Sequence, residues 1–315
     1  MEFPIEYKAI LESSLQSIPL KKLRDCFESI MNRYKNDSGK GNSLINNELE
    51  AKVYGAYRLP STFKAVSEAL SHCLEIYNDN FTSLIDVGAG NGAASLAANQ
   101  LIMSIDKTIM LENNKYMMSV GNNLISSINL QEKLQYINYD LSKDNLDITS
   151  DLVISSYVLN ELDRNSRINA INKMWNMTNK MMLVVEPGTP EGFNLIREIR
   201  DYLFSIGAYV VAPCTHMGVC LNTWCHFSSR VSRSKLHKDL KGGDAPYEDE
   251  KYCYIAFSKN KITPCKNRIL RHPQINPGFV ELEVCTKEGF KHIKYSKKDK
   301  ELFKKARKSD AGDQI

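Results

Sequence analysis

The feature that most constrains the fold is a short apolar segment that leads into a glycine-rich loop. Residues 83–93 read Ser-Leu-Ile-Asp-Val-Gly-Ala-Gly-Asn-Gly-Ala. The apolar half predicts a buried strand, and the Ala- and Leu-rich residues that follow predict a helix. Closely spaced glycines permit a tight turn and let a ligand approach the backbone, and a helix N-terminus offers free N–H groups. We therefore expect a strand–loop–helix unit that binds a nucleoside-containing ligand.

Short apolar segments and helical segments continue to alternate after this loop. Such alternation predicts an α/β fold whose parallel sheet is covered on both faces. Ligands of these sheets bind beyond the carboxyl ends of the strands. The predicted strands are 83–87, 108–111, 134–139, 151–158 and 180–185, and the predicted helices are 92–103, 114–126, 161–178 and 191–206.

The flanking regions follow different patterns. Apolar spacing predicts two short helices within residues 1–35, a polar loop over 36–46 and a helix that begins at Pro60. Beyond residue 207 the sequence predicts a basic helix, a strand, a β-meander and a lysine-rich helix (231–240, 251–258, 268–295 and 297–308). We expect a helical N-terminal extension (1–60), an α/β domain (61–212) and a basic, cysteine-containing region rich in strands (213–315).

Two nucleoside ligands compete for the glycine loop. Gly88, Gly90 and Ala93 satisfy the dinucleotide pattern G-x-G-x-x-G/A, and an acid follows about 20 residues later. S-adenosylmethionine sites share that ribose-binding acid. A carboxylate at the mouth of the loop would repel a pyrophosphate but attract the ammonium and sulfonium of S-adenosylmethionine, which favours the latter. Under this hypothesis the cofactor-binding residues are Asp86, Gly88, Gly90, Gly92, Glu112 and Asp140.

The end of the fourth predicted strand is where an acceptor would bind. Tyr157 and Asn160 are the candidates to face it. The Asn-Pro-Pro-Tyr pattern of exocyclic-amine methylation is absent, no cysteine nucleophile lies nearby, and no residue is a convincing general base. The catalytic residues, and whether the chain is an enzyme, therefore stay open.

A cysteine cluster follows the α/β segment. Three cysteines and two histidines fall within residues 214–226, and Cys285 follows a predicted strand and adds a distant fourth thiol. Eight cysteines in 315 residues are too few for a disulfide scaffold, so we expect them reduced and available to bind metal. Four thiolates suit either Zn²⁺ or an iron–sulfur cluster. Cys265 is the main rival to Cys285, and His216 and His226 are alternative ligands.

Charge is distributed unevenly along the chain. Residues 230–308 hold 21 Lys/Arg against 10 Asp/Glu, whereas the whole chain has a net charge of +4. A basic region on an acidic body is typical of nucleic-acid binding, with phosphates held by Lys and Arg. The RNA-binding candidates are Arg230, Arg233, Lys235, Lys238, Arg268 and Arg271.

Several motifs occur in an order that resembles one family. They are Tyr54–Pro60, Asp86–Gly90, Ser156–Leu162, Glu186–Pro190, Ala212–Cys214, Trp224–Phe227 and Tyr247–Lys251. In these motifs the chain is similar to the methyltransferase-like proteins of mitochondrial small-ribosomal-subunit assembly and their bacterial relatives. The resemblance implies a class I methyltransferase fold, association with small-subunit RNA and a 4Fe–4S cluster. By position its ligands would be Cys214, Cys220, Cys225 and Cys285.

Three functional hypotheses remain open. The first is an S-adenosylmethionine-dependent methyltransferase of small-subunit ribosomal RNA. The second is a catalytically silent RNA-binding assembly factor, and the third is a dinucleotide-dependent enzyme. We expect a monomer whose partner is small-subunit RNA or a pre-ribosomal particle, without a membrane partner. The acidic start, Met1–Glu6, leads us to expect a cytoplasmic, bacterial-type protein, in contrast to its mitochondrial relatives.

Overall fold

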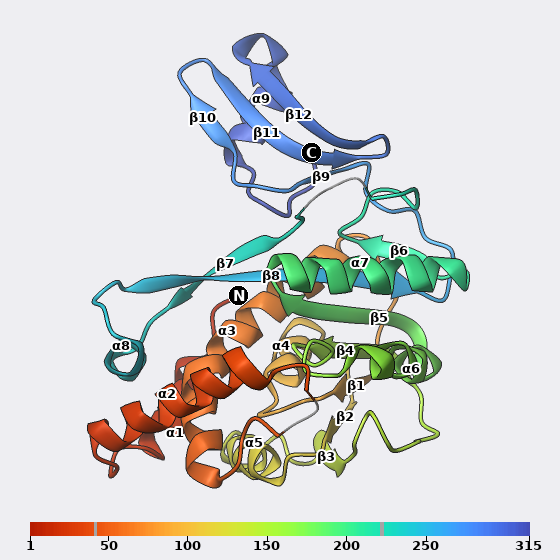
Figure 1. Cartoon of the computed structure of the whole chain (residues 1–315). Coiled ribbons are helices and arrows are strands. Elements are labelled where there is room, and N and C mark those ends of the chain that lie inside the picture. The colour runs from red at the N-terminus through yellow and green to blue at the C-terminus, as the bar shows by residue number, and fades with distance from the viewer. Residues whose placement is uncertain (41–42, 221–223) are drawn as a thin grey trace. The chain divides into compact units, whose positions relative to one another are not determined.

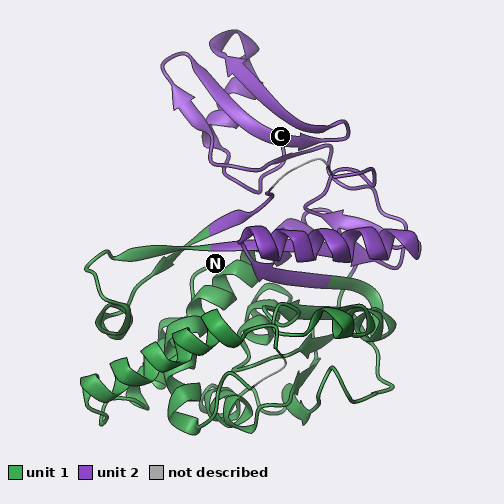
Figure 2. Cartoon of the chain, in the orientation of Figure 1, with its two compact units in different colours: residues 1–68, 80–182, 229–250 green, residues 69–79, 183–228, 251–315 purple. Residues whose placement is uncertain are grey.

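The computed structural model describes residues 1–40, 43–220 and 224–315 (Figure 1). These residues form two compact units, each assembled from segments that are far apart in the sequence (Figure 2). Unit 1 comprises Met1–Glu68, Asn80–Met182 and Ser229–Glu250, and unit 2 comprises Ala69–Asp79, Leu183–Ser228 and Lys251–Ile315.

A β-sheet forms the centre of unit 1. Its strands are β1 (Ser83–Val87), β2 (Lys107–Glu112), β3 (Leu134–Asn138), β4 (Ser150–Ser156) and the first half of β5 (Thr178–Pro187). The order is β3-β2-β1-β4-β5, and β1 runs parallel to both β2 and β4. Four of the five residues of β1 are buried, as expected for a strand covered on both faces. This arrangement confirms the predicted α/β fold with a class I methyltransferase-type sheet.

The helices that cover this sheet follow the ends of its strands after short loops. Their N-termini therefore lie at the carboxyl edge of the sheet, where ligands of such sheets bind. They are α4 (Ala93–Leu101), α5 (Lys115–Ser127) and α6 (Arg164–Asn176). The side chain of Asn114 caps α5 by accepting hydrogen bonds from the N–H groups of Tyr116 and Met117. Asp163 caps α6 in the same manner, so polar residues just after β2 and β4 fix the start of each helix.

Three helices precede the sheet: α1 (Ile5–Ser13), α2 (Leu20–Asp37) and α3 (Glu48–Leu74). The prediction that a helix begins at Pro60 is wrong, because α3 begins twelve residues earlier and contains Pro60 in its interior. Leu59 and Phe63, on either side of the proline, are both buried, so packing on both sides outweighs the helix-breaking tendency of the ring. None of the helices in the described ranges has the length and apolar character required to cross a membrane.

Residues 229–250 of unit 1 form a hairpin that contains a short helix. It consists of the second part of β7 (Phe227–Ser232), the short helix α8 (Lys235–Lys241) and the first part of β8 (Tyr247–Ser258), and β7 pairs with β8. The ring of His237 on α8 packs edge-on against Tyr57 of α3, with centroids 4.7 Å apart. Arg58 of α3 makes two hydrogen bonds of 2.7 and 2.6 Å to the carboxylate of Glu250. The hairpin is thereby fixed to α3.

Unit 2 contains the second half of β5, the second part of β8, the helix α7 (Pro190–Ser205) and the strand β6 (Tyr209–Ala212). The strand order is β5-β8-β6, and β6 runs antiparallel to β8. Residues Tyr252–Ser258 of β8 are buried without interruption, so this half of the strand lies in the core. The loop after β6 carries three of the cysteines.

The last fifty residues of unit 2 form a small sheet with its own core. Its elements are β9 (Asn267–Ile269), β10 (Gln274–Asn276), β11 (Phe279–Thr286), β12 (Gly289–Ser296), the single 3-10 turn η1 (Lys297–Asp299) and α9 (Lys300–Lys308). Alternate residues of β11, namely Val280, Leu282 and Val284, are buried and pack with Phe303 and Ala306 of α9. The antiparallel pairs of β11 with β10, β12 and β9 confirm the predicted β-meander.

Candidate functional site

The glycine loop joins β1 to α4 at the carboxyl edge of the sheet of unit 1. Gly88, Gly90 and Gly92 adopt positive φ angles of 69°, 54° and 94°. A side chain is disfavoured at such angles. A Cβ atom on Gly88 would also lie 2.3 Å from Cγ2 of Val158, so that position is sterically closed to any other residue. The loop thus leaves its backbone bare, as the sequence predicts.

Glu112 is the last residue of β2, and its carboxylate lies against the glycine loop. One carboxylate oxygen, Oε2, accepts a 2.8 Å hydrogen bond from the N–H of Gly90. The other, Oε1, accepts from the N–H groups of Asn113 and Asn114 at 2.9 and 2.7 Å. Burial raises the pKa of Glu112, although these three N–H groups oppose the shift. Oε2 keeps lone-pair capacity for a ligand hydroxyl, whereas both lone-pair sites of Oε1 are taken.

Asp140 follows β3 and lies at the same edge of the sheet. Its Oδ1 accepts hydrogen bonds from the N–H and the hydroxyl of Ser142 at 3.0 and 2.5 Å, and its Oδ2 pairs with Nζ of Lys143 at 2.9 Å. Burial raises the pKa of Asp140, but the bonds from Ser142 and Lys143 outweigh it and lower the pKa to about 2. Asp140 is therefore ionised at neutral pH.

Asp86 does not lie at the mouth of the loop. It is fully buried, and its Oδ2 accepts hydrogen bonds from the N–H and hydroxyl of Ser95 on α4, at 3.0 and 2.7 Å. Burial is the main cause that raises its pKa to about 6. Asp86 therefore lies between β1 and α4. Its carboxylate is not at the mouth of the loop, so the argument that its charge would repel a pyrophosphate no longer holds.

The end of β4 brings together three residues of unit 1. Tyr157 has a left-handed φ of 60°, which turns its side chain away from the direction of the strand. Its hydroxyl donates a 2.9 Å hydrogen bond to Oε1 of Glu250, and the guanidinium of Arg58 lies 4.7 Å from its ring centre. Tyr157, a candidate to face the acceptor, is therefore held in place by the salt bridge between Arg58 and Glu250.

A cavity of about 460 Å³ joins these groups within unit 1. That volume lies within the usual range for a small-molecule site. Of the predicted cofactor residues, Gly88, Gly90, Glu112 and Asp140 line it, whereas Asp86 and Gly92 do not. Of the acceptor candidates, Tyr157 lines it and Asn160 does not.

The sequence did not indicate that residues before the sheet also line this cavity. They include Tyr34 on α2, the segment Ser43–Ile45, and Tyr54 and Arg58 on α3. The rings of Tyr34 and Tyr54 stack with centroids 5.3 Å apart. Only the fold brings these residues to the strand ends, so no local pattern links them to a ligand. The Tyr54–Pro60 motif contains Tyr54 and Arg58 and was the one sequence signal that drew attention to any of them.

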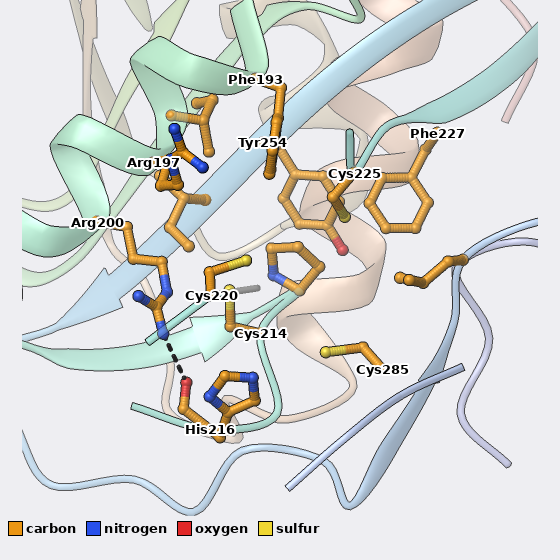
Figure 3. Close-up of a pocket in the computed structure, with 14 residues that line it drawn as sticks. Phe193, Arg197, Arg200, Cys214, His216, Cys220, Cys225, Phe227, Tyr254 and Cys285 are labelled. Carbon is orange, nitrogen blue, oxygen red and sulfur yellow. Dashed lines mark hydrogen bonds between the residues drawn. The ribbon is translucent and has the colours of Figure 1, made fainter. Parts of the chain in front are cut away.

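The second candidate site is the cysteine cavity of unit 2, which has a volume of about 40 Å³ (Figure 3). Cys214, Cys220, Cys225 and Cys285 all line it. All eight cysteines are free thiols. Burial raises the pKa of Cys214 to about 12, although the charge of Arg200 acts in the opposite direction. Cys265, the main rival to Cys285, does not line this cavity. His216 does line it, and His226 does not.

Arg200 of α7 is the charged group most closely associated with this cavity. Its residue is 3% exposed, and it lines the cavity with the four thiols. Its Nη2 donates to the carbonyl oxygens of His216 and Gly218, which fixes the loop that carries Cys214 and Cys220 (Figure 3). Its Nε has no hydrogen-bond partner in the described part of the chain. A buried cation with an open donor suits an anionic occupant.

The chemistry of the donor set is compatible with both groups that four thiolates can hold. Cys214, Cys220, Cys225 and Cys285 line one cavity beside the buried guanidinium of Arg200. A structural zinc ion takes four such ligands, and so does a 4Fe–4S cluster. Across the described ranges, no three Cys, His, Asp or Glu residues are placed to hold one metal ion.

The predicted RNA-binding residues differ in how exposed they are and in which partners they contact. Arg268 is fully buried and donates to the carbonyl of Gly312, so RNA cannot reach it. Arg271 donates to three backbone carbonyls, those of Trp224, His226 and Leu270, and serves the packing of unit 2. Arg233 donates to two carbonyls, and Arg230 pairs with Asp249 at 3.3 Å. The sequence missed the backbone carbonyl partners of Arg233, Arg268 and Arg271. Lys235 is exposed and Lys238 is half-buried.

Comparison with known proteins shows several similar chains. The human mitochondrial ribosome assembly protein METTL17 is 24% identical over 288 residues, which cover 83% of this chain and 61% of METTL17. A Pyrococcus horikoshii protein, described as a candidate RNA methyltransferase, is 16% identical with a TM-score of 0.46, over 74% of this chain and 98% of that one. The N-methyltransferase NodS of Bradyrhizobium japonicum is 10% identical with a TM-score of 0.44, over 75% and 99%.

A family model described as mitochondrial small ribosomal subunit Rsm22 matches residues 48–315. The expectation of a cytoplasmic, bacterial-type protein is wrong, since both this family and the human relative are described as mitochondrial. The acidic residues Met1–Glu6, on which it was based, do not report on the compartment. Because the match covers well over half of its residues, the chain belongs to the Rsm22 family.

Proposed function

We propose that the cavity of unit 1 binds S-adenosylmethionine. The observation that carries this proposal is that the glycine loop, the carboxylate of Glu112 and the carboxylate of Asp140 line one cavity of about 460 Å³. Glu112 would accept from a ribose hydroxyl and Asp140 from the adenine amino group, while the bare backbone at Gly88 and Gly90 would contact the remainder of the cofactor. Methyltransferases among the similar structures support this choice over a dinucleotide, which uses the same loop pattern.

The protein is proposed to act in assembly of the small ribosomal subunit, on its ribosomal RNA. Membership of the Rsm22 family and the assembly role printed for the human relative support this. The chain spans 61% of that relative, so the role of the whole relative is extended here as a proposal. We expect the chain to crosslink to small-subunit RNA in cells, and crosslinks confined to unrelated RNA would contradict the proposal.

Methyl transfer to that RNA is the first candidate activity, and the intact loop supports it. A specific observation favours the second candidate, a cofactor-binding assembly factor without turnover. The acceptor-side candidate Tyr157 is committed to the carboxylate of Glu250, which also accepts two hydrogen bonds from Arg58. A methylation map of small-subunit RNA with and without the gene separates the two, since loss of the gene removes a methyl group from the map if the protein transfers that group.

The cysteine cavity is proposed to hold a 4Fe–4S cluster on Cys214, Cys220, Cys225 and Cys285. Four thiols line one cavity beside Nε of Arg200, which has no partner in the described part of the chain, and this supports the proposal. A cluster bound there would supply a redox group and would crosslink segments of unit 2. Protein purified without oxygen should contain iron and acid-labile sulfide and show broad visible absorbance. Stoichiometric zinc in a colourless protein would contradict the cluster and indicate a zinc site instead.

A further inference from the structure

The exposed cations of this chain gather in a segment that the sequence did not single out as a site. Residues 297–308, which form η1 and α9, carry seven Lys/Arg against two acids. All seven cations are exposed: Lys297, Lys298, Lys300, Lys304, Lys305, Arg307 and Lys308. This contrasts with Arg233, Arg268 and Arg271, whose guanidinium groups bind backbone carbonyls.

Packing fixes which face of α9 meets the solvent. Phe303 and Ala306 are the buried residues of the helix, and they pack on the buried residues of β11. Because these two apolar residues face the sheet, the charged residues around them cannot rotate into it. The cations are therefore presented as one surface, which we name the lysine surface and define by the seven residues above.

The acids within the segment are already engaged. The carboxylate of Asp299 accepts hydrogen bonds from the N–H and hydroxyl of Ser296, at 2.6 and 2.9 Å. Glu301 pairs with Lys304 at 2.8 Å. In the described part of the chain, Lys304 is the one member of the lysine surface with an ion pair within 4 Å. The remaining cations keep their charge for an external anion.

Helix electrostatics accounts for only half of this surface. Lys305, Arg307 and Lys308 lie in the last turn of α9, where cations oppose the negative end of the helix dipole. Lys300 is the first residue of α9, and Lys297 and Lys298 lie in η1 directly before it, so the dipole of α9 does not favour these three cations. Lys300 in addition adopts a φ of 43°, a strained angle for a residue with a side chain. Neither the helix dipole nor the ion pairs of the described ranges account for these three lysines.

We propose that the lysine surface binds the phosphate backbone of RNA, with Lys297, Lys298 and Lys300 as its centre. A row of flexible ammonium groups at a helix N-terminus, whose dipole adds to the attraction, matches a chain of phosphates. Such contacts hold RNA without reading its sequence. This inference rests on the proposed function, since it assigns the RNA of the small ribosomal subunit to one surface of this chain.

The test compares three triple variants of the full chain in binding to a small-subunit RNA fragment across a salt series. Lys297→Gln/Lys298→Gln/Lys300→Gln removes the central charges, and the corresponding Arg triple keeps them. Lys21→Gln/Lys22→Gln/Lys35→Gln removes the same number of exposed lysines from α2 and serves as the matched control. We expect the first variant to bind at least about 10-fold more weakly, with a salt slope lower by about 2 to 3. The Arg triple and the control should match the wild type.

Each other outcome has a distinct meaning. Wild-type protein that does not bind the RNA fragment at all would refute the proposed function and the surface together. Wild-type binding that the Gln triple leaves unchanged would refute the surface alone. Vesicles of phosphatidylserine provide the last arm, because loss of vesicle binding with intact RNA binding would assign the surface to membranes. Equal unfolding midpoints for the Gln triple and its control will show that the fold is retained.

Discussion

The carboxylate of Glu112 accepts a 2.8 Å hydrogen bond from the backbone N–H of Gly90. One residue ends the second strand and the other lies in the loop after the first, so this bond joins the two parts of the proposed nucleoside site. The same carboxylate also accepts from two N–H groups at the start of α5. Glu112 thus shapes the loop as well as offering an oxygen to a ligand.

Replacement of Glu112 should therefore weaken S-adenosylmethionine binding. In Glu112→Gln the amide nitrogen cannot accept from an N–H group, and the charge is lost. Hydrogen bonds to charged groups contribute about 1.5–3 kcal/mol, so affinity should fall by at least about 10-fold. Calorimetric titration with the cofactor measures this. Glu132→Gln, an exposed position, should bind as wild type does, and equal affinity of all three proteins would contradict the site.

Replacement of Gly88 should destabilise the fold for a steric reason. The added methyl group of Gly88→Ala would lie 2.3 Å from Val158, at a φ of 69°. Gly207→Ala is the matched control, because Gly207 has a φ of 86° and nothing within 4 Å of the new atom. Chemical denaturation should show a larger loss for Gly88→Ala, by about 1–3 kcal/mol. Adding Val158→Ala should recover part of that difference, and no recovery would argue against this contact.

The buried carboxyl of Asp86 predicts a pH dependence of stability. Its pKa is about 6 in the fold and 3.8 ordinarily, because burial disfavours the charge. The folded chain therefore binds more protons than the unfolded chain between those values, and this group lowers the free energy of unfolding as pH rises through them. Asp86→Asn removes the titration. At neutral pH it should be more stable than wild type by up to about 3 kcal/mol.

The measurement for Asp86 is the difference in unfolding free energy between the two proteins over a pH series. That difference should grow from about pH 4 to pH 6 and then level off. Subtraction removes the contribution of other groups, such as Asp140, whose pKa is lowered. A constant difference across the series would show that Asp86 is ionised in the fold at all these pH values.

Arg200 predicts a property of the proposed cluster that can be measured without an activity. A nearby cation stabilises the more negative, reduced state, so Arg200→Gln should make the midpoint potential more negative. Iron should also be lost to a chelator about 10-fold faster. Arg200→Lys should keep most of the wild-type potential, and Arg197→Gln, which removes a half-buried cation of the same cavity, should shift it less than Arg200→Gln does. An unchanged potential in Arg200→Gln would refute this role, whereas iron-free wild-type protein would refute the cluster itself.

Local patterns predicted the α/β part of the fold well. The strand 83–87 was predicted with the bounds that β1 has. The predicted strand 108–111 is one residue shorter than β2 at each end, and the predicted strand 134–139 is one residue longer than β3. Continuous apolar segments and glycine turns are local signals, so a single sequence contains them. The helix α3 was mispredicted because burial around Pro60 depends on distant residues.

The site was predicted in part for the same reason. The bare loop and Glu112 follow from spacing along one strand–loop–helix unit and the next. By contrast, the direction of the Asp86 side chain is decided by Ser95, and the burial of Arg268 by Gly312 at the far end of the chain. A count of charges along a sequence does not show which cations form internal contacts in the fold. For this reason only some of the predicted RNA-binding residues are available to an external ligand.

One wall of the cofactor cavity has a consequence for comparison within the family. Tyr34 and Ser43–Ile45 line that cavity, yet the family match begins at residue 48. The carboxylates of Glu112 and Asp140 lie within the matched residues, whereas this wall lies before them. If S-adenosylmethionine binds as proposed, changes in Tyr34 or Ser43–Ile45 would alter how fast it enters and leaves without removing the carboxylates that would hold it.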